Sequence, residues 1–327
     1  MVLIGNRYKI VNFDENLQND KIYIAKDTFN NNKRVILKLI QHTEYVNKDF
    51  ITDLIDEMTG TRDLTSPYIL KILDVGIQKV KKKVYYYIVS PFFDGITLDR
   101  FMESIGDRKL SSEDVISIIT KILKSLEFMH SNGIYHGNLS SKNILINDNL
   151  EVKVLDFLIT KSNKGEVIRD NDLSFLSPQQ ISVNFTSFET DFYTLGLILF
   201  NLMFNEHPYE VSTDESVMLK NIDKGIKWED YIYKFDSVEF YDICKKLLVR
   251  QDSERYKDMK DVLLDVTNIL YNKAKIQNKK IQTLSIDNLD GAQKKIYEYE
   301  LKYLGKNNKM IKIAIALIII FIMIIFL

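Results

Sequence analysis

The chain has 327 residues, of which 46% are hydrophobic and 27% are charged, and its formal net charge is -1 at pH 7. This composition is that of a globular protein, and the length suffices for one large two-lobed domain or two average domains. The near-zero net charge excludes a strong overall attraction to nucleic acid. The single cysteine, Cys244, excludes an internal disulfide framework, and we expect it in a helix core.

The first part of the chain is predicted to be rich in strands. Apolar and polar residues alternate from residue 7 to residue 40, as in RYKIV, KIYIAK and RVILKLI. Residues 50–64 are then predicted to form a helix with Phe50, Leu54, Ile55 and Met58 on one face. Two further predicted strands, KILDVGIQ and KVYYYIVSP, are joined by a lysine-rich turn.

The second part of the chain is predicted to be mainly helical. A helix is expected to begin after Ser111, because a serine N-cap is followed by acidic residues. Two short strands, NILIN and EVKVLDF, come next, and the apolar residues 192–204 are too short to span a membrane and predict a buried helix. Helical patterns continue to Tyr271. The predicted fold class is α+β, with a strand-rich lobe at about residues 1–90 and a helical lobe at about 95–271.

A polar loop lies between apolar segments at residues 134–146, IYHGNLSSKNILI. It resembles the protein kinase catalytic loop H-R-D-L-K-x-x-N, VILK at 35–38 resembles V-A-I-K, IVSPFFDG at 88–95 resembles the hinge, and DFL at 156–158 resembles D-F-G. SPQ, DFYTLG and DSERY resemble later kinase motifs. In this order and spacing they resemble bacterial members of the eukaryotic-like Ser/Thr protein kinase family over roughly residues 7–271, which implies a bilobal protein-kinase-like fold.

The resemblance implies roles for five residues of the cleft. Lys38 would pair with the α- and β-phosphates of ATP and be held by Glu57, and Phe93 lies in the hinge segment, where a nucleotide would bind. Asn143 and Asp156 carry oxygen donors suited to Mg²⁺. ATP and Mg²⁺, weakly bound, are therefore the expected cofactors.

Other positions depart from the family pattern. Asn138 stands at the position of the catalytic Asp, where the loss of a general base typically costs about 10²–10⁴-fold in rate. Ser140 replaces the Lys that would neutralise the transferring phosphate. Gly137 replaces an Arg that would read a phosphorylated activation loop, and Ile36 replaces the Ala that usually touches adenine.

The loop that covers the phosphates in kinases has also lost its glycines. A gapless alignment puts Glu15, Leu17 and Asp20 at the three glycine positions. Side chains there obstruct a close approach of the backbone, and the two carboxylates would repel a triphosphate. These departures favour a pseudokinase that acts as a signalling scaffold or switch. The alternatives are a low-activity ATP-dependent Ser/Thr kinase and a purely structural membrane adaptor.

The segment at residues 310–327, MIKIAIALIIIFIMIIFL, has one charge, Lys312, in an otherwise apolar run. At about 1.5 Å per residue it would span about 27 Å, close to the ~30 Å hydrocarbon core. It predicts a single transmembrane helix, preceded by a juxtamembrane stalk at 272–309. Lysines before the apolar run favour a kinase-like domain in the cytoplasm. The expected partners are the lipid bilayer and one or more proteins, with no nucleic acid.

Overall fold

The structure is a computed structural model, and it describes residues 3–12, 22–42, 49–80, 82–166, 172–235 and 238–269. The chain divides into two units, residues 1–269 and 270–327, and everything described belongs to the first. The predicted stalk and transmembrane helix lie outside the described residues. In the part of the chain that is described, no helix combines the length and apolarity that crossing a bilayer requires.

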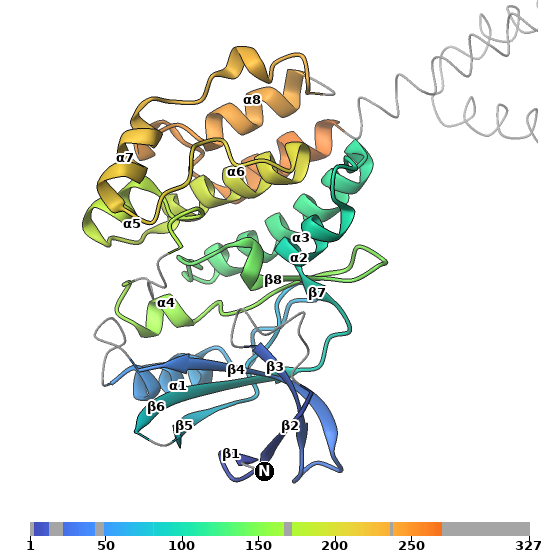
Figure 1. Ribbon diagram of the computed structural model, residues 1–327, viewed down its shortest axis with the longest axis vertical. Coiled ribbons are helices and arrows are strands. Elements are labelled where there is room, and N and C mark those ends of the chain that lie inside the picture. Colours follow the sequence, from blue (N-terminus) through green and yellow to red (C-terminus); the bar gives the residue numbers. More distant parts are fainter. Residues whose placement is uncertain are drawn as a thin grey trace, which may run out of the picture. The chain divides into compact units, whose positions relative to one another are not determined.

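An antiparallel sheet forms the N-terminal lobe (Figure 1). Its strands are β1 (Leu3–Ile4), β2 (Tyr8–Asn12), β3 (Ile22–Asp27), β4 (Lys33–Gln41), β5 (Asp74–Val80) and β6 (Lys83–Pro91). Their order in space is β1-β2-β3-β4-β6-β5. The alternating pattern therefore predicted this lobe, because side chains on successive strand positions point to opposite faces.

Helix α1 (Phe50–Gly60) enters between β4 and β5 and packs on the sheet. Phe50 and Leu54 are fully buried, and the Phe50 ring meets Tyr86 edge-on with centroids 5.3 Å apart. Ile55 is 41% exposed, so the face predicted to carry Phe50, Leu54, Ile55 and Met58 is only partly buried. The helix also ends four residues earlier than predicted.

The C-terminal lobe is mainly helical, with a small sheet on the side that faces the N-terminal lobe (Figure 1). Its named helices are α2 (Leu98–Ile105), α3 (Ser112–Ser131), α4 (Ile159–Ser162), α5 (Pro178–Val183), α6 (Phe188–Phe204), α7 (Glu215–Asp223) and α8 (Val238–Leu247), and residues 259–269 are also helical. The small sheet has the order β7 (Ile96–Thr97), β8 (Ile144–Ile146) and β9 (Val152–Val154).

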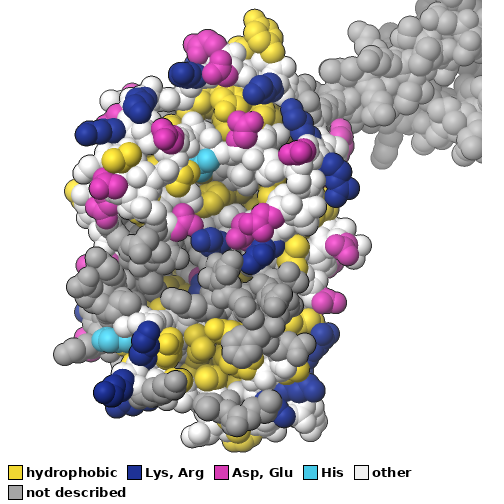
Figure 2. Space-filling view, in the orientation of Figure 1, with side chains coloured by type: hydrophobic (Ala, Val, Ile, Leu, Met, Phe, Trp, Pro, Cys, Tyr) yellow, Lys and Arg dark blue, Asp and Glu magenta, His cyan; other side chains and the backbone are white. Residues whose placement is uncertain are grey.

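Helix α6 is the centre of the helical lobe (Figure 1). It contacts both α3 and α8, and most of its side chains are buried, which explains why its sequence is apolar on every face. The predictions of a buried helix here and of a buried Cys244, on α8, are confirmed. Ser111 caps α3 as predicted, with its hydroxyl accepting the Asp114 N–H at 3.1 Å. Positive and negative side chains are intermixed over this lobe on the face shown in Figure 2.

Candidate active site

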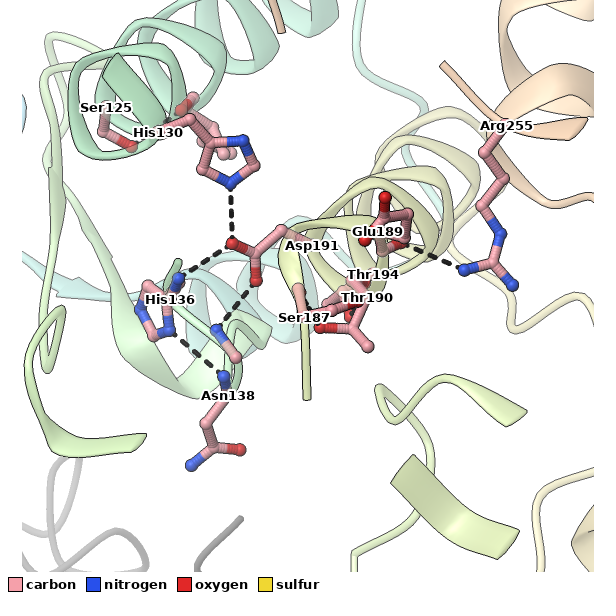
Figure 3. A network of polar contacts seen from close by, with 12 residues as sticks. Ser125, His130, His136, Asn138, Ser187, Glu189, Thr190, Asp191, Thr194 and Arg255 are labelled. Atoms are coloured by element: carbon pink, nitrogen blue, oxygen red, sulfur yellow. Dashed lines mark hydrogen bonds and ion pairs between the residues drawn. The ribbon is translucent and has the colours of Figure 1, made fainter. Parts of the chain in front are cut away.

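A buried carboxylate on α6 fixes the polar loop at residues 136–143. Asp191 is 1% exposed and accepts the backbone N–H groups of His136 and Gly137, each at 2.8 Å (Figure 3). The Nε2 of His130, on α3, lies 2.9 Å from the same carboxylate. Two successive backbone N–H groups therefore bond to one side chain. This side chain belongs to α6, so a helix that follows much later in the chain fixes the backbone conformation of the loop.

His136 links the loop to the segment that precedes Asp156. Its ring is fully buried, and Nε2 lies 2.8 Å from the carbonyl oxygen of Leu155. Burial lowers the pKa of His136, although the carboxylates of Asp191 and Asp156 act in the opposite direction. The ring is therefore neutral at physiological pH, and its hydrogen bonds link the loop to the segment at Leu155.

Asn138 occupies the position of the expected base. Its backbone N–H donates to His136 Nδ1 at 3.3 Å, and its carbonyl accepts from Asn143 Nδ2 at 2.7 Å. The carboxamide itself points away from Asp191 (Figure 3). An amide oxygen can accept a hydrogen bond but does not take up a proton at physiological pH. Asn138 can therefore orient a hydroxyl group but cannot deprotonate it.

Three of the predicted site residues lie together in the cleft. Lys38, on β4, donates from Nζ to Asn143 Oδ1 at 3.1 Å and also to a carboxylate oxygen of Asp156. Asp156 has a φ of +63°, a left-handed conformation that is uncommon outside glycine and occurs at functional sites. The ammonium thus sits between the two oxygen donors that the sequence assigns to Mg²⁺.

Glu57 has a different partner from the one predicted. Its carboxylate pairs with Lys161 at 2.8 Å, and Lys161 lies on α4, which packs against α1 (Figure 1). The expected pairing of Lys38 with Glu57 is therefore replaced in this structure. The physical reason is that each charge meets an opposite charge nearer to it: Asp156 neutralises Lys38, and α4 brings Lys161 to Glu57.

Apolar side chains close the inner part of the cleft. One cluster contains the buried residues Ile22, Ile36, Leu70, Leu145 and Leu155, with Phe93 packed against it. Ile36, at 5% exposure, stands opposite Ser90 in the sheet. A cavity of about 440 Å³ remains, lined by Phe93, Asp94 and Asp148 among others. Phe93 therefore lies at a cavity, and the carboxylates of Asp94 and Asp148 border that cavity.

Two residues of the site carry oxygen donors suited to a divalent cation, but Lys38 bonds to both of them. Asn143 and Asp156 supply hard oxygen donors of the kind Mg²⁺ prefers. Over the described ranges, no group of three or more His, Cys, Asp or Glu side chains could hold a metal. A Mg-nucleotide would have to displace Lys38 from both oxygens and fit beneath Ile36. Glu15, Leu17 and Asp20 lie outside the described residues.

Two lysines of the site were missed by the sequence interpretation. Lys161 holds Glu57, and Lys142 pairs with Asp172 at 2.8 Å. Burial would raise the pKa of Asp172, but the hydrogen bonds from Lys142 and Ser174 lower it below its ordinary value. No motif marks either lysine, because each ion pair joins segments that meet only in the folded chain.

Comparison with known proteins gives the family. The protein kinase domain family matches residues 21–267. The probable serine/threonine-protein kinase PknB of Lactococcus lactis subsp. lactis is 27% identical over 270 residues, which cover 81% of this chain and 42% of that protein. Serine/threonine-protein kinase PrkC of Bacillus subtilis is 25% identical over 272 residues, covering 80% and 40%. The chain therefore spans well under half the length of these relatives.

A solved structure supports the same fold. The crystal structure of the Mycobacterium tuberculosis PknI kinase domain matches with a TM-score of 0.55 and 16% identity, covering 76% of this chain and 90% of that one. At this identity the likeness concerns the fold alone, and it confirms the predicted two-lobed kinase fold. Since the family match covers well over half of the 327 residues, this chain belongs to the protein kinase domain family.

Proposed function

We propose that this protein is a pseudokinase, which uses the kinase fold to bind partner proteins and transfers little or no phosphate. The observation that carries the proposal is Asn138 at the base position of a loop that Asp191 otherwise holds in shape. Hydrogen bonds to Asp191 hold the backbone of the loop in place, so the proposed loss at Asn138 concerns the side-chain chemistry and not the folding of the loop. Ser140 stands where the kinase pattern has a lysine, so a positive charge that would neutralise the transferring phosphate is also absent.

The ionic groups of the cleft support the same proposal. In active kinases, phosphoryl transfer depends on a lysine held by a glutamate and on an aspartate that holds Mg²⁺. Here Lys38 neutralises Asp156 directly, and Glu57 is held by Lys161. These side chains therefore satisfy one another without nucleotide or metal, as suits a domain that works through binding.

The first test is phosphoryl transfer by the full-length protein. With γ-radiolabelled ATP and Mg²⁺, we expect no autophosphorylation, and no labelling of a generic acceptor protein, above the level of a Lys38→Ala variant. The reason is that three features that would stabilise the same transition state are absent: the base, the phosphate-neutralising lysine and the Lys38–Glu57 pair. Transfer that Lys38→Ala abolishes would instead identify an enzyme.

A slow Ser/Thr kinase is the second candidate, and one observation favours it. Asn143 and Asp156 each lie within bonding distance of Lys38, so part of a metal and phosphate site is assembled. The relatives in Lactococcus and Bacillus are also named as serine/threonine kinases. For a slow enzyme, Asn138→Asp should raise transfer by about 10²–10⁴-fold. For a pseudokinase, that variant should remain at the background level.

Nucleotide binding gives the next expected result. We expect isothermal titration of the full-length protein with ATP and Mg²⁺ to show affinity weaker than low micromolar, because Ile36 crowds the adenine end and Lys38 is already paired. Binding without turnover would indicate a nucleotide-operated switch, and no binding would favour an adaptor. Low-micromolar affinity would contradict the expectation, because it would show that neither Ile36 nor the pairing of Lys38 prevents tight binding of ATP.

We further propose that residues 310–327 anchor the protein in a membrane, with the kinase domain in the cytoplasm. The support is the apolar run itself and the lysines that precede it. Truncation after Asn308 should release the domain from the membrane fraction. Ile318→Asp should weaken anchoring, since a charge at mid-bilayer costs about 2.5–3.5 kcal/mol, while Ile318→Leu should not. Extraction of the unaltered protein by alkaline carbonate would exclude a spanning anchor.

A further inference from the structure

A second cavity, of about 520 Å³, shares no lining residue with the cavity beside Phe93. It lies between the end of α1, the segment at residues 61–73, helix α3 and the residues that follow Asp156. Its lining residues are Met58, Thr59, Thr61, Arg62, Leu64, Thr65, Ser66, Ile69, Lys71, Ile72, Leu73, Phe128, Phe157 and Leu158. The volume is within the range of small-molecule sites, about 300–1,000 Å³.

The interior of this cavity is apolar. Ile69, Ile72, Phe157 and Leu158 are buried members of the main hydrophobic core, and Phe128 packs against that core. An apolar ligand would therefore gain roughly 25 cal/mol for each Å² that it removes from water. The body of a suitable ligand is a short hydrocarbon or an aromatic ring.

The charged lining residues are both positive. No Asp or Glu lines the cavity, and its charged members are Arg62 and Lys71. The ammonium of Lys71 donates to the carbonyl oxygen of Arg62 at 2.6 Å, which places the ammonium beside that residue. Within the described residues, the guanidinium of Arg62 has no hydrogen-bond or ion-pair partner. An anion at this rim would meet an unpaired guanidinium and a lysine that still has N–H groups to donate.

We propose that this cavity binds a small anionic amphiphile, with its apolar body among Ile69, Ile72 and Phe128 and a carboxylate-like head at Arg62 and Lys71. The charge pattern is opposite to that of the cavity beside Phe93, whose charged lining residues are both Asp. The two cavities therefore select for ligands of opposite charge, and an acid is directed to this one.

Such a ligand would contact both elements that carry the ion pairs of the cleft. Met58 directly follows Glu57 on α1, and Phe157 directly follows Asp156. Occupancy would hold α1 and the segment after Asp156 in their present arrangement, in which Glu57 binds Lys161. The proposal is independent of whether the protein transfers phosphate, because none of these contacts involves nucleotide.

The test uses three probes that share a phenylalkyl group and differ in the terminal polar group: 4-phenylbutyrate, an anion; 4-phenyl-1-butanol, which is neutral; and 4-phenylbutylamine, a cation. Each is titrated into the full-length protein in lipid nanodiscs, with protein-free nanodiscs subtracting partition into lipid. We expect the acid to bind about tenfold more tightly than the amine, with the alcohol between them. In the double variant Arg62→Gln, Lys71→Gln, the acid should fall to within about twofold of the alcohol, and the affinity of the alcohol should not change.

Two further variants localise the binding. Arg108→Gln removes an exposed arginine that does not line the cavity, and it should leave the preference for the acid unchanged. Leu64→Trp adds bulk at the lining and should abolish binding of all three probes while the protein still unfolds cooperatively. The proposal is overturned if no probe binds, if acid and amine bind equally, or if the preference survives the double variant.

Discussion

Gly137→Ala should destabilise the kinase domain by about 2–5 kcal/mol, whereas Gly133→Ala should cost only about 1–2 kcal/mol. Both glycines have left-handed backbones, with φ of +68° and +71°, so the conformational penalty for alanine is similar. At Gly137 an added Cβ would lie 2.4 Å from Thr186 Cγ2 and 2.8 Å from Thr160 Cγ2. At Gly133 no heavy atom lies within 4 Å of the added carbon. The difference between the variants therefore isolates the crowding.

Chemical unfolding followed by the fluorescence of Trp228, the single tryptophan of the chain, measures both variants. Equal losses of stability would contradict the crowding argument. The result also bears on the departure from the kinase pattern at this position. Thr160 and Thr186 occupy the space that the family's arginine would need to leave the backbone, so Gly137→Arg alone should not rebuild an active loop. It should destabilise the domain at least as much as alanine does.

Asp191→Ala should cost about 3–5 kcal/mol of unfolding free energy, the second large effect. Alanine would leave the buried N–H groups of His136 and Gly137 without an acceptor, and each unsatisfied group costs roughly 1–3 kcal/mol. It would also remove the partner of His130. Asp191→Asn keeps the size and one acceptor oxygen, and we expect it to cost about half as much.

The matched control for this variant is Asp56→Ala, on the exposed side of α1. Surface substitutions of this kind usually change stability by no more than about 0.5 kcal/mol. Denaturant unfolding of both variants gives the comparison. If Asp191→Ala lowered the unfolding free energy by less than about 1 kcal/mol, the loop would keep its shape without this carboxylate. That result would contradict the role given to Asp191 in holding the loop.

Two ion pairs neutralise charged side chains of the cleft. A buried charge without a partner is costly, so the mostly buried Asp156 is stabilised by its ion pair with Lys38. Lys38 forms an ion pair with Asp156, and Lys161 forms an ion pair with Glu57. The cavity beside Phe93 is bordered by Asp94 and Asp148.

The sequence by itself determined the family, the two lobes and the departures at Asn138 and Ile36. These follow from local properties: strand alternation, helix caps, and the order of short motifs along the chain. The buried helix at residues 192–204 was predictable for the same reason, since a run that is apolar on every face must be covered on every face.

Only the tertiary structure decided which charges meet. The pairing of Glu57 with Lys161 depends on where α4 packs against α1, and the pairing of Lys38 with Asp156 depends on how the two lobes close. Ile55 fits the helical period but faces solvent, because the width of the covered stripe is set by the sheet beneath. The role of Asp191 was hidden for the same reason. Residues far apart in the chain become neighbours through packing, and no local pattern records the distance between them.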